Sequence, residues 1–256
     1  MSKEIGLIID AISKSSRFLR RDYLEIEKLQ STKSDLKKFY QRTYKTLLRE
    51  LNYELGRYYN SVVFVSDNGS DSDSNSIGDF KDEILLIDSL DCSINFNRSL
   101  PFFGLFVILL KKYIDTVIVD KAIIYLPIEG DVFYVEKGKP VLSEKNSNEL
   151  LGRISRMRLL KSDDIDNIVV SSDIESIEIA KKISSNIRIF GSISYSVAAF
   201  ISGKIDVCIM SCNINQIYIR GLSLFTHELG AIYKILNNTI VIVSNYSLYK
   251  KIAQII

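Results

Sequence analysis

The sequence predicts a protein of the α/β class, and three features of the chain indicate it. The first sixty residues carry apolar side chains at helical spacing, and long apolar runs typical of strands follow up to about residue 138. From residue 168 onward, short strand-like runs alternate with helical patterns, as they do in α/β layers. The composition shifts between Leu142 and Arg158, so we expect an α+β half at 1–145 and an α/β half at 146–256.

Two helices account for the first sixty residues. In the first helix, apolar side chains recur at Ile5, Ile8 and Ile12. The second helix is expected to begin near Asp35, an N-cap candidate, and its apolar stripe continues to Leu55. Its lysines and arginines lie on the opposite face, which is typical of a solvated surface.

The strands of the first half are interrupted by a polar loop of low complexity at 66–79. This loop contains D-x-D-x-N from Asp71, but its spacing and its strand-like flanks do not fit a helix–loop–helix calcium site. We therefore interpret it as a flexible loop at the active site rather than as a calcium site. The strands expected around it are 61–66, 83–88, 102–112, 116–127 and 131–138.

The second half alternates between the two kinds of element. Strands are expected at 168–171, 187–190, 205–210 and 239–243. Helices are expected at 174–183, 192–202 and 222–234, with a short last helix from Ser247.

The composition argues against several classes of protein. The formal net charge is +2 and acids and bases are mixed, so we expect neither nucleic acid nor a membrane as a partner. Three cysteines and a single histidine, His227, fit neither a disulfide framework nor an ordinary zinc site. The longest apolar run, 101–110, is far shorter than the roughly 20 residues that span a bilayer. The N-terminus lacks the pattern of a signal peptide, so we expect a cytoplasmic protein.

The candidate chemistry lies in the stretch IDSLDCSINF, 87–96, directly after an apolar strand. Asp88 and Asp91 stand three residues apart there and can point into one pocket. Carboxylate oxygens are hard ligands that suit Mg²⁺, together with waters and a substrate phosphate. Taken alone, an Asp at a strand end also forms turns and caps helices, so the spacing by itself is a weak signal.

The wider context resembles the signature of the inositol monophosphatase family, the Mg²⁺-dependent, lithium-sensitive sugar phosphatases. The family pattern D-P-[LI]-D-G-[ST]-x-N-F, followed by P-F-[FV], is similar to DSLDCSINF at 88–96 and PFF at 101–103. Two further segments, at 121–140 and 188–209, and the closing helix at 224–234 also resemble the family. The resemblance runs from about residue 35 to the end of the chain. It implies a layered αβαβα sandwich, the sugar-phosphatase fold.

The resemblance also implies roles for individual residues. Asp88 and Asp91 would bind the metals, with the backbone carbonyl of Leu90 between them. Ser93 would orient the attacking water, and the N–H groups of Cys92 and Ser93 would face the phosphate. Gly191 and Ser192 match the family's substrate-side pair; an upstream acid that completes the metal site and helps activate water is matched by Asp67.

Three positions depart from the family pattern. Tyr218 takes the place of the last metal-binding Asp, and a neutral phenol is a poor Mg²⁺ ligand. Lys38 and Gln41 stand where the family has a Thr and an Asp that support the catalytic hydroxyl. Cys92 replaces a Gly that lets phosphate approach the backbone; a redox role for this thiol is an alternative to a tolerated substitution.

The sequence thus leads to two hypotheses. In the first, the chain is a divergent Mg²⁺-dependent phosphomonoesterase, of the inositol monophosphate or fructose-1,6-bisphosphate class, with one or two ions and a weakened second site. In the second, it is a catalytically impaired phosphatase-like protein with a binding or assembly role. The resemblance further implies a small phosphorylated metabolite as ligand and a homodimer.

Overall fold

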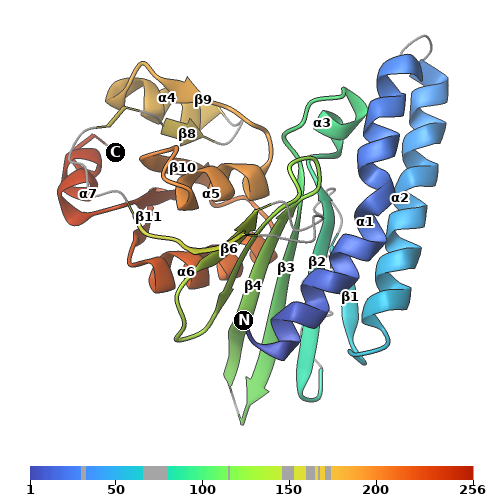
Figure 1. Ribbon diagram of the computed structural model, residues 1–256. Coiled ribbons are helices and arrows are strands. Elements are labelled where there is room, and N and C mark those ends of the chain that lie inside the picture. Colours follow the sequence, from blue (N-terminus) through green and yellow to red (C-terminus); the bar gives the residue numbers. More distant parts are fainter. Residues whose placement is uncertain are drawn as a thin grey trace.

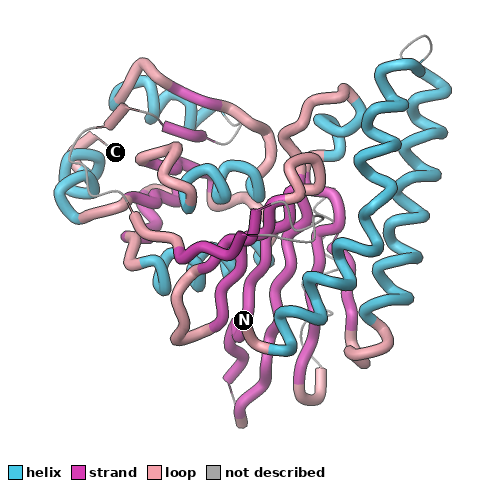
Figure 2. The backbone as a smooth tube through the Cα atoms, viewed as in Figure 1, coloured by secondary structure: helices cyan, strands magenta, loops and turns pink. Residues whose placement is uncertain are grey.

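The computed structural model describes residues 1–29, 33–65, 80–114, 116–145, 153–159, 165–166, 168–170 and 174–255. The described residues form two β-sheets separated and flanked by helices (Figure 1). The tube in Figure 2 shows the same order, with two long helices on one side and several short helices around the smaller sheet.

The first sheet has seven strands in the order β1-β2-β3-β4-β5-β6-β7, which is also their order in the chain. Only β1 and β2 are parallel; all other neighbours in this sheet are antiparallel. The strands are β1 Val62–Val65, β2 Glu83–Asp91, β3 Gly104–Tyr113, β4 Thr116–Leu126, β5 Asp131–Glu136, β6 Leu142–Lys145 and β7 Arg153–Arg156.

The second sheet has five strands in the order β11-β12-β10-β8-β9. Strands β8, β9 and β10 are parallel to one another, and β12 runs antiparallel to both β10 and β11. The strands are β8 Ile168–Val170, β9 Ile187–Arg188, β10 Val207–Ser211, β11 Ile232–Leu236 and β12 Thr239–Val243.

Seven helices in the described residues complete five layers. Helices α1 and α2 cover one face of the first sheet, α5 and α6 lie between the sheets, and α4 and α7 cover the far face of the second sheet. Short α3 follows β2. The helices are α1 Lys3–Leu29, α2 Lys33–Leu55, α3 Ser93–Asn97, α4 Ile174–Ile183, α5 Ile193–Ile201, α6 Gln216–Leu229 and α7 Tyr246–Ala253. The α/β class and the αβαβα sandwich are thereby confirmed.

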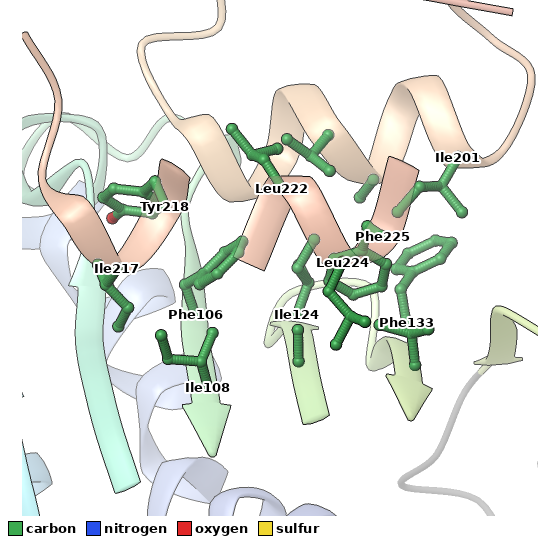
Figure 3. Close-up of a cluster of buried hydrophobic side chains, with 14 of the residues drawn as sticks. Phe106, Ile108, Ile124, Phe133, Ile201, Ile217, Tyr218, Leu222, Leu224 and Phe225 are labelled. Atoms are coloured by element: carbon green, nitrogen blue, oxygen red, sulfur yellow. The ribbon is translucent and has the colours of Figure 1, made fainter. Parts of the chain in front are cut away.

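The alternation of side chains along each strand explains why the first sheet is covered on both faces. In β3, Leu105, Val107 and Leu109 pack under α1 and α2, whereas Phe106 and Ile108 pack against α5 and α6. Figure 3 shows the inner core, in which side chains of β3, β4 and β5 meet those of α5 and α6. This packing fixes α6 against the sheet beside the end of β2.

Three local expectations are wrong. Helix α6 begins at Gln216 and ends at Leu229, rather than spanning 222–234, because Gly230 takes a left-handed conformation (φ 76°) and the chain then turns into β11. Helix α2 begins at Lys33, so Asp35 lies in its first turn rather than at its N-cap. The polar strands β6 and β7, of which β7 lies at the edge of the first sheet, were not expected, because their short sequences lack an apolar run.

β7 pairs with β6 and extends the first sheet beyond residue 145; the division at 145/146 stays a prediction. Among the described residues, no helix has both the length and the apolar character that crossing a bilayer requires.

Candidate active site

Asp88 and Asp91 lie at the end of β2, in the interior of the first sheet, and each is only 4% exposed. Asp88 pairs with Val65 of β1 and with Phe106 of β3, and Asp91 pairs with Gly104. The register shifts between the two acids, so the strand is irregular where they lie. A buried carboxylate needs hydrogen-bond or ionic partners, and the structure supplies hydrogen bonds to both acids.

Asp88 accepts hydrogen bonds from one backbone group and one side chain. The N–H of Leu90 donates to Asp88 Oδ1 at 3.1 Å, and the hydroxyl of Tyr218 donates to Oδ2. Tyr218 is 5% exposed, and its ring packs edge-on against Phe106 at 5.0 Å between centroids, as Figure 3 shows. A β-carbon placed on Gly221 would lie 2.4 Å from a ring carbon of Phe106. This close approach seats α6 on the sheet and brings Tyr218 to Asp88.

Asp91 joins the first sheet to α5. Its Oδ2 accepts hydrogen bonds from Ser192 Oγ at 2.8 Å and from the N–H of Ser194 at 2.6 Å. Ser192 is the N-cap of α5, and its Oγ also accepts from the N–H of Tyr195. Asp91 therefore serves as a second cap of this helix from across the site. Ser192, the expected substrate-side residue, is fixed against a candidate metal ligand.

The turn after Asp91 holds the accessible part of the site. Cys92 has a left-handed conformation, φ 63° and ψ 62°, and both Cys92 and Ser93 are partly exposed. A β-carbon placed on Gly191 would lie 3.2 Å from Cys92 Sγ, so the segment before α5 lies directly over this turn. Gly191 itself is exposed and has a φ of 77°.

Asn95 fastens this segment to the turn. Its Nδ2 donates to the carbonyl oxygen of Phe102 at 2.6 Å and to that of Phe190 at 2.7 Å, and Asn95 is 7% exposed. One buried amide thus ties the loop after α3 to the loop before α5.

Three half-buried aromatic residues, Phe102, Phe190 and Tyr195, pack together beside the turn, and we call them the aromatic wall. The ring centroids of its three pairs lie 5.0–5.2 Å apart. Burial raises the pKa of the Tyr195 hydroxyl, and the charge of neighbouring Glu129 raises it further. Burial also raises the pKa of Glu129.

The donor chemistry of the site fits Mg²⁺ in kind. Asp88 and Asp91 offer carboxylate oxygens close to the backbone of Leu90, which is the oxygen-only set that this ion prefers. Within the described ranges, however, no group of three or more His, Cys, Asp or Glu side chains could hold a metal ion. Asp88 Oδ2 also already accepts the Tyr218 hydroxyl.

The structure brings together most of the residues that the sequence singled out. Asp88, Leu90, Asp91, Cys92 and Ser93 follow one another at the end of β2 and the start of α3, and Gly191 and Ser192 lie against them. Asp67 and the acidic loop from Asp71 lie outside the described residues. Lys38 and Gln41 are exposed on α2. His227 is exposed, Cys208 is buried and Cys212 is partly exposed.

Sequence reasoning missed the parts of the site that depend on distant contacts. Asn95 stood in the recognised signature without an assigned role, although its place there was a signal. Phe102, Phe190, Ser194 and Tyr195 lay in stretches that resemble the family, but their contacts across about 90 to 100 residues carried no signal in the sequence.

Comparisons with known proteins agree with the fold. No protein-family model matches the chain. An inositol-1-monophosphatase from Caulobacter vibrioides is 24% identical over 212 residues, which cover 78% of this chain and 77% of that protein.

Solved structures give the same result for the fold. The extragenic suppressor protein suhB from Bartonella henselae superposes with a TM-score of 0.73 at 18% identity, covering 100% of this chain and 98% of that one. Inositol monophosphatase-II from Staphylococcus aureus superposes with a TM-score of 0.64 at 14% identity, covering 100% and 99%. The fold is therefore that of the inositol monophosphatases. By sequence and fold, the chain is a distant relative of the inositol monophosphatase family.

Proposed function

We propose that the chain is a divergent Mg²⁺-dependent phosphomonoesterase that hydrolyses a small polyol or sugar phosphate, of the inositol monophosphate or fructose-1,6-bisphosphate class. The observation that carries this proposal is the pair of buried carboxylates, Asp88 and Asp91, directly before an accessible turn with Ser93. The distant relationship to inositol monophosphatases supports the reaction type.

The proposed ligand set is Asp67, Asp88, Asp91 and the carbonyl oxygen of Leu90. Strand β1 is parallel to β2, and Val65 lies opposite Asp88. Because parallel strands end at the same edge of a sheet, the chain leaves β1 beside Asp88, which favours Asp67 as the third acid. When bound, Mg²⁺ would neutralise phosphate charge and lower the pKa of its water.

The remaining roles belong to side chains and backbone groups of the turn. We assign to the Ser93 hydroxyl the orientation of the attacking water and to Asp67 the acceptance of its proton. The N–H groups of Cys92 and Ser93 would bind the phosphate, with Gly191 and Ser192 on the other side of it. Because Tyr218 donates to Asp88, we propose that one ion binds well and a second binds weakly.

The alternative function, a phosphatase-like protein with little catalysis and a binding or assembly role, also has a specific observation in its favour. Tyr218 already satisfies an oxygen of Asp88, and Lys38 and Gln41 are exposed on α2. In either case we propose a small phosphorylated metabolite as ligand, a homodimer and a cytoplasmic location.

Phosphate release decides between the two functions. The purified chain is incubated with inositol-1-phosphate, fructose-1,6-bisphosphate or a nucleoside 3′-phosphate, with Mg²⁺ or with a chelator. We expect Mg²⁺-dependent release from at least one ester and a loss of about 10²- to 10⁴-fold in Asp88→Asn. The exposed Asp82, just before β2, gives the matched control Asp82→Asn, which should keep full activity.

Two results would contradict the proposed phosphatase. Activity that persists in Asp88→Asn would exclude the metal-binding role of this carboxylate. If no ester is turned over but the chain still binds a phosphorylated ligand, the binding role is favoured instead.

A further inference from the structure

A second cavity lies between β4, α6 and β11, and it shares no lining residue with the candidate active site. Helix α6 runs between the two sheets there (Figure 1), β4 belongs to the first sheet, and β11 is an edge strand of the second. The volume of the cavity is about 530 Å³. Sites for small molecules in proteins typically have volumes of about 300 to 1,000 Å³, so the cavity is large enough for such a ligand.

Helical spacing and strand alternation explain which side chains reach the cavity. On α6, Ile219, Ser223 and His227 are spaced by four residues and therefore share one face of the helix. On β11, Tyr233 and Ile235 are two residues apart and point to the same side of the strand. Ser223, His227 and Ile235 are exposed, so the cavity can be reached from solvent.

The walls of the cavity are mostly apolar. Ile118 and Val119 of β4, Ile219 of α6 and Tyr233 of β11 are half-buried, and Ile235 is 53% exposed. An apolar molecule in the cavity would remove the remaining surface of these side chains from water, which favours binding. A purely polar molecule would gain nothing from the same walls.

The charged groups that line the cavity do not balance. Lys137 and Arg220 carry positive charge, and neither forms an ion pair within the described residues. Glu228 is the acid among the lining residues, and its Oε1 already accepts a hydrogen bond from the N–H of Gly138 at 2.8 Å and lies 3.2 Å from His227 Nδ1. The lining therefore has an excess of positive charge and offers hydrogen-bond donors to an anion.

The hydroxyl of Tyr233 is a second, independent observation. Tyr233 lines the cavity, and its hydroxyl is buried without a hydrogen-bond partner in the described part of the chain. Buried hydroxyl groups are usually paired, so an unpaired one calls for a partner that these residues do not supply. An oxygen of an anionic ligand would provide it.

We propose that this cavity binds an apolar small molecule that carries one anionic group, such as an aromatic or aliphatic carboxylate or sulfonate. The apolar walls from β4, α6 and β11 hold the body of the molecule, and Arg220 and Lys137 bind its anionic group. The proposal goes beyond the proposed function, because none of these residues has a role at the metal or the phosphate. It assigns a second ligand site to the chain.

Two fluorescent dyes test the proposal on the purified chain. The dyes 8-anilinonaphthalene-1-sulfonate and N-phenyl-1-naphthylamine share the same aromatic body, and only the first carries a negative charge. We expect the sulfonate to bind at one site per chain and about 5- to 50-fold more tightly than the neutral dye, because charge-assisted hydrogen bonds add to the apolar contact. Octanoate should compete with the sulfonate more strongly than octanol does.

Three variants test whether the dye lies in the cavity. Arg220→Gln should remove the preference for the sulfonate, while the neutral dye binds as before. Lys234 is exposed and lies between Tyr233 and Ile235 on β11, so its side chain points to the opposite side of the strand. The matched control Lys234→Gln should therefore keep the parent affinity for both dyes. Ser223→Trp places a large ring in the cavity and should abolish the binding of both, and thermal unfolding checks that each variant folds.

Four outcomes would overturn the proposal. The first three are equal affinities for the two dyes, binding of neither dye, and equal effects of Arg220→Gln and Lys234→Gln. In the fourth, no dye binds and Ser223→Trp lowers the oligomeric state in sedimentation, which would make the cavity part of an interface between copies of the chain. Because the dyes carry no phosphate ester and bind without Mg²⁺, each result is independent of the proposed phosphatase activity.

Discussion

At the scale of single residues, the main departure from a two-metal site is the hydrogen bond from Tyr218 to Asp88. A buried carboxylate is costly without a partner, and the phenol provides one while carrying no charge. A cation at the same oxygen would provide charge and would compete with this hydroxyl. We therefore expect Tyr218 to stabilise the fold in the absence of a cation and to weaken the binding of a cation.

These two opposite effects of the Tyr218 hydroxyl give a prediction for Tyr218→Phe. Loss of a hydrogen bond to a buried charged group should lower the free energy of unfolding by about 1–3 kcal/mol without Mg²⁺. The same variant should bind Mg²⁺ more tightly, because no hydroxyl competes for Asp88. Urea unfolding with and without Mg²⁺ measures the first effect, and calorimetric titration with Mg²⁺ measures the second.

Tyr134 provides the matched control for this experiment. It is 1% exposed, and its hydroxyl has no hydrogen-bond partner in the described part of the chain. Tyr134→Phe should therefore change neither stability nor Mg²⁺ affinity appreciably. Equal stability of Tyr218→Phe and the parent in both conditions, with the same Mg²⁺ affinity, would show that the phenol does not compete with the ion.

The sequence was sufficient for the residues that follow one another and insufficient for those that meet across the fold. The acids Asp88 and Asp91 were predictable because a signature of consecutive positions carries them. Tyr218 was predictable as a substitution, but not as the donor to Asp88. That contact depends on how closely α6 packs on Phe106, which is set by the missing side chain of Gly221.

At the scale of elements, short α3 and the loop before α5 act as one unit. The carbonyl oxygens of Phe102 and Phe190 both accept hydrogen bonds from the Asn95 amide, and Asp91 caps α5. The two segments come from different halves of the chain, so these few bonds set the distance between the acids and the substrate side.

Removal of the Asn95 amide should loosen this unit. Asn95→Ala leaves two carbonyls without their donor, and we expect the free energy of unfolding to fall by about 1–3 kcal/mol. In addition, Mg²⁺-dependent phosphate release should fall, because the segment before α5 is no longer held against the turn that carries the acids. Urea unfolding measures the first effect, and phosphate release measures the second.

Asn97 lies on the same helix and makes no side-chain hydrogen bond in the described residues. Asn97→Ala should be close to neutral in both measurements. A loss of stability in Asn95→Ala with unchanged phosphate release would mean that Asn95 is a structural residue only.

At the scale of the whole molecule, a cluster of charges attaches α1 to the first sheet. Lys121 of β4 is 3% exposed, and its Nζ lies 2.6 Å from Glu4 Oε2 in the first turn of α1 and also contacts Asp120. Lys111 of β3 lies 3.1 Å from Asp120 Oδ2 and 3.3 Å from Glu4 Oε2. The position of the long helical layer thus depends partly on ionic contacts that pH can change.

The cluster predicts how stability depends on pH. Burial alone would raise the pKa of Asp120, but the hydrogen bonds from Lys121 and Lys111 outweigh it and lower this pKa below the ordinary 3.8. A lowered carboxyl pKa contributes stability that is present above the unfolded value of 3.8. That contribution is lost as pH falls through the lower folded value.

Asp120→Asn removes this contribution, so we expect a loss of about 1–3 kcal/mol in the free energy of unfolding at neutral pH. Since the parent loses the same contribution in acid, the difference between parent and variant should shrink at about pH 3 and below. Urea unfolding at neutral pH and in acid measures this difference between parent and variant.

The exposed pair of Asp10 and Lys14 on α1 supplies the control, because Asp10→Asn should change stability little at either pH. If Asp120→Asn lowers the free energy of unfolding equally in acid and at neutral pH, packing rather than charge accounts for the contribution of Asp120.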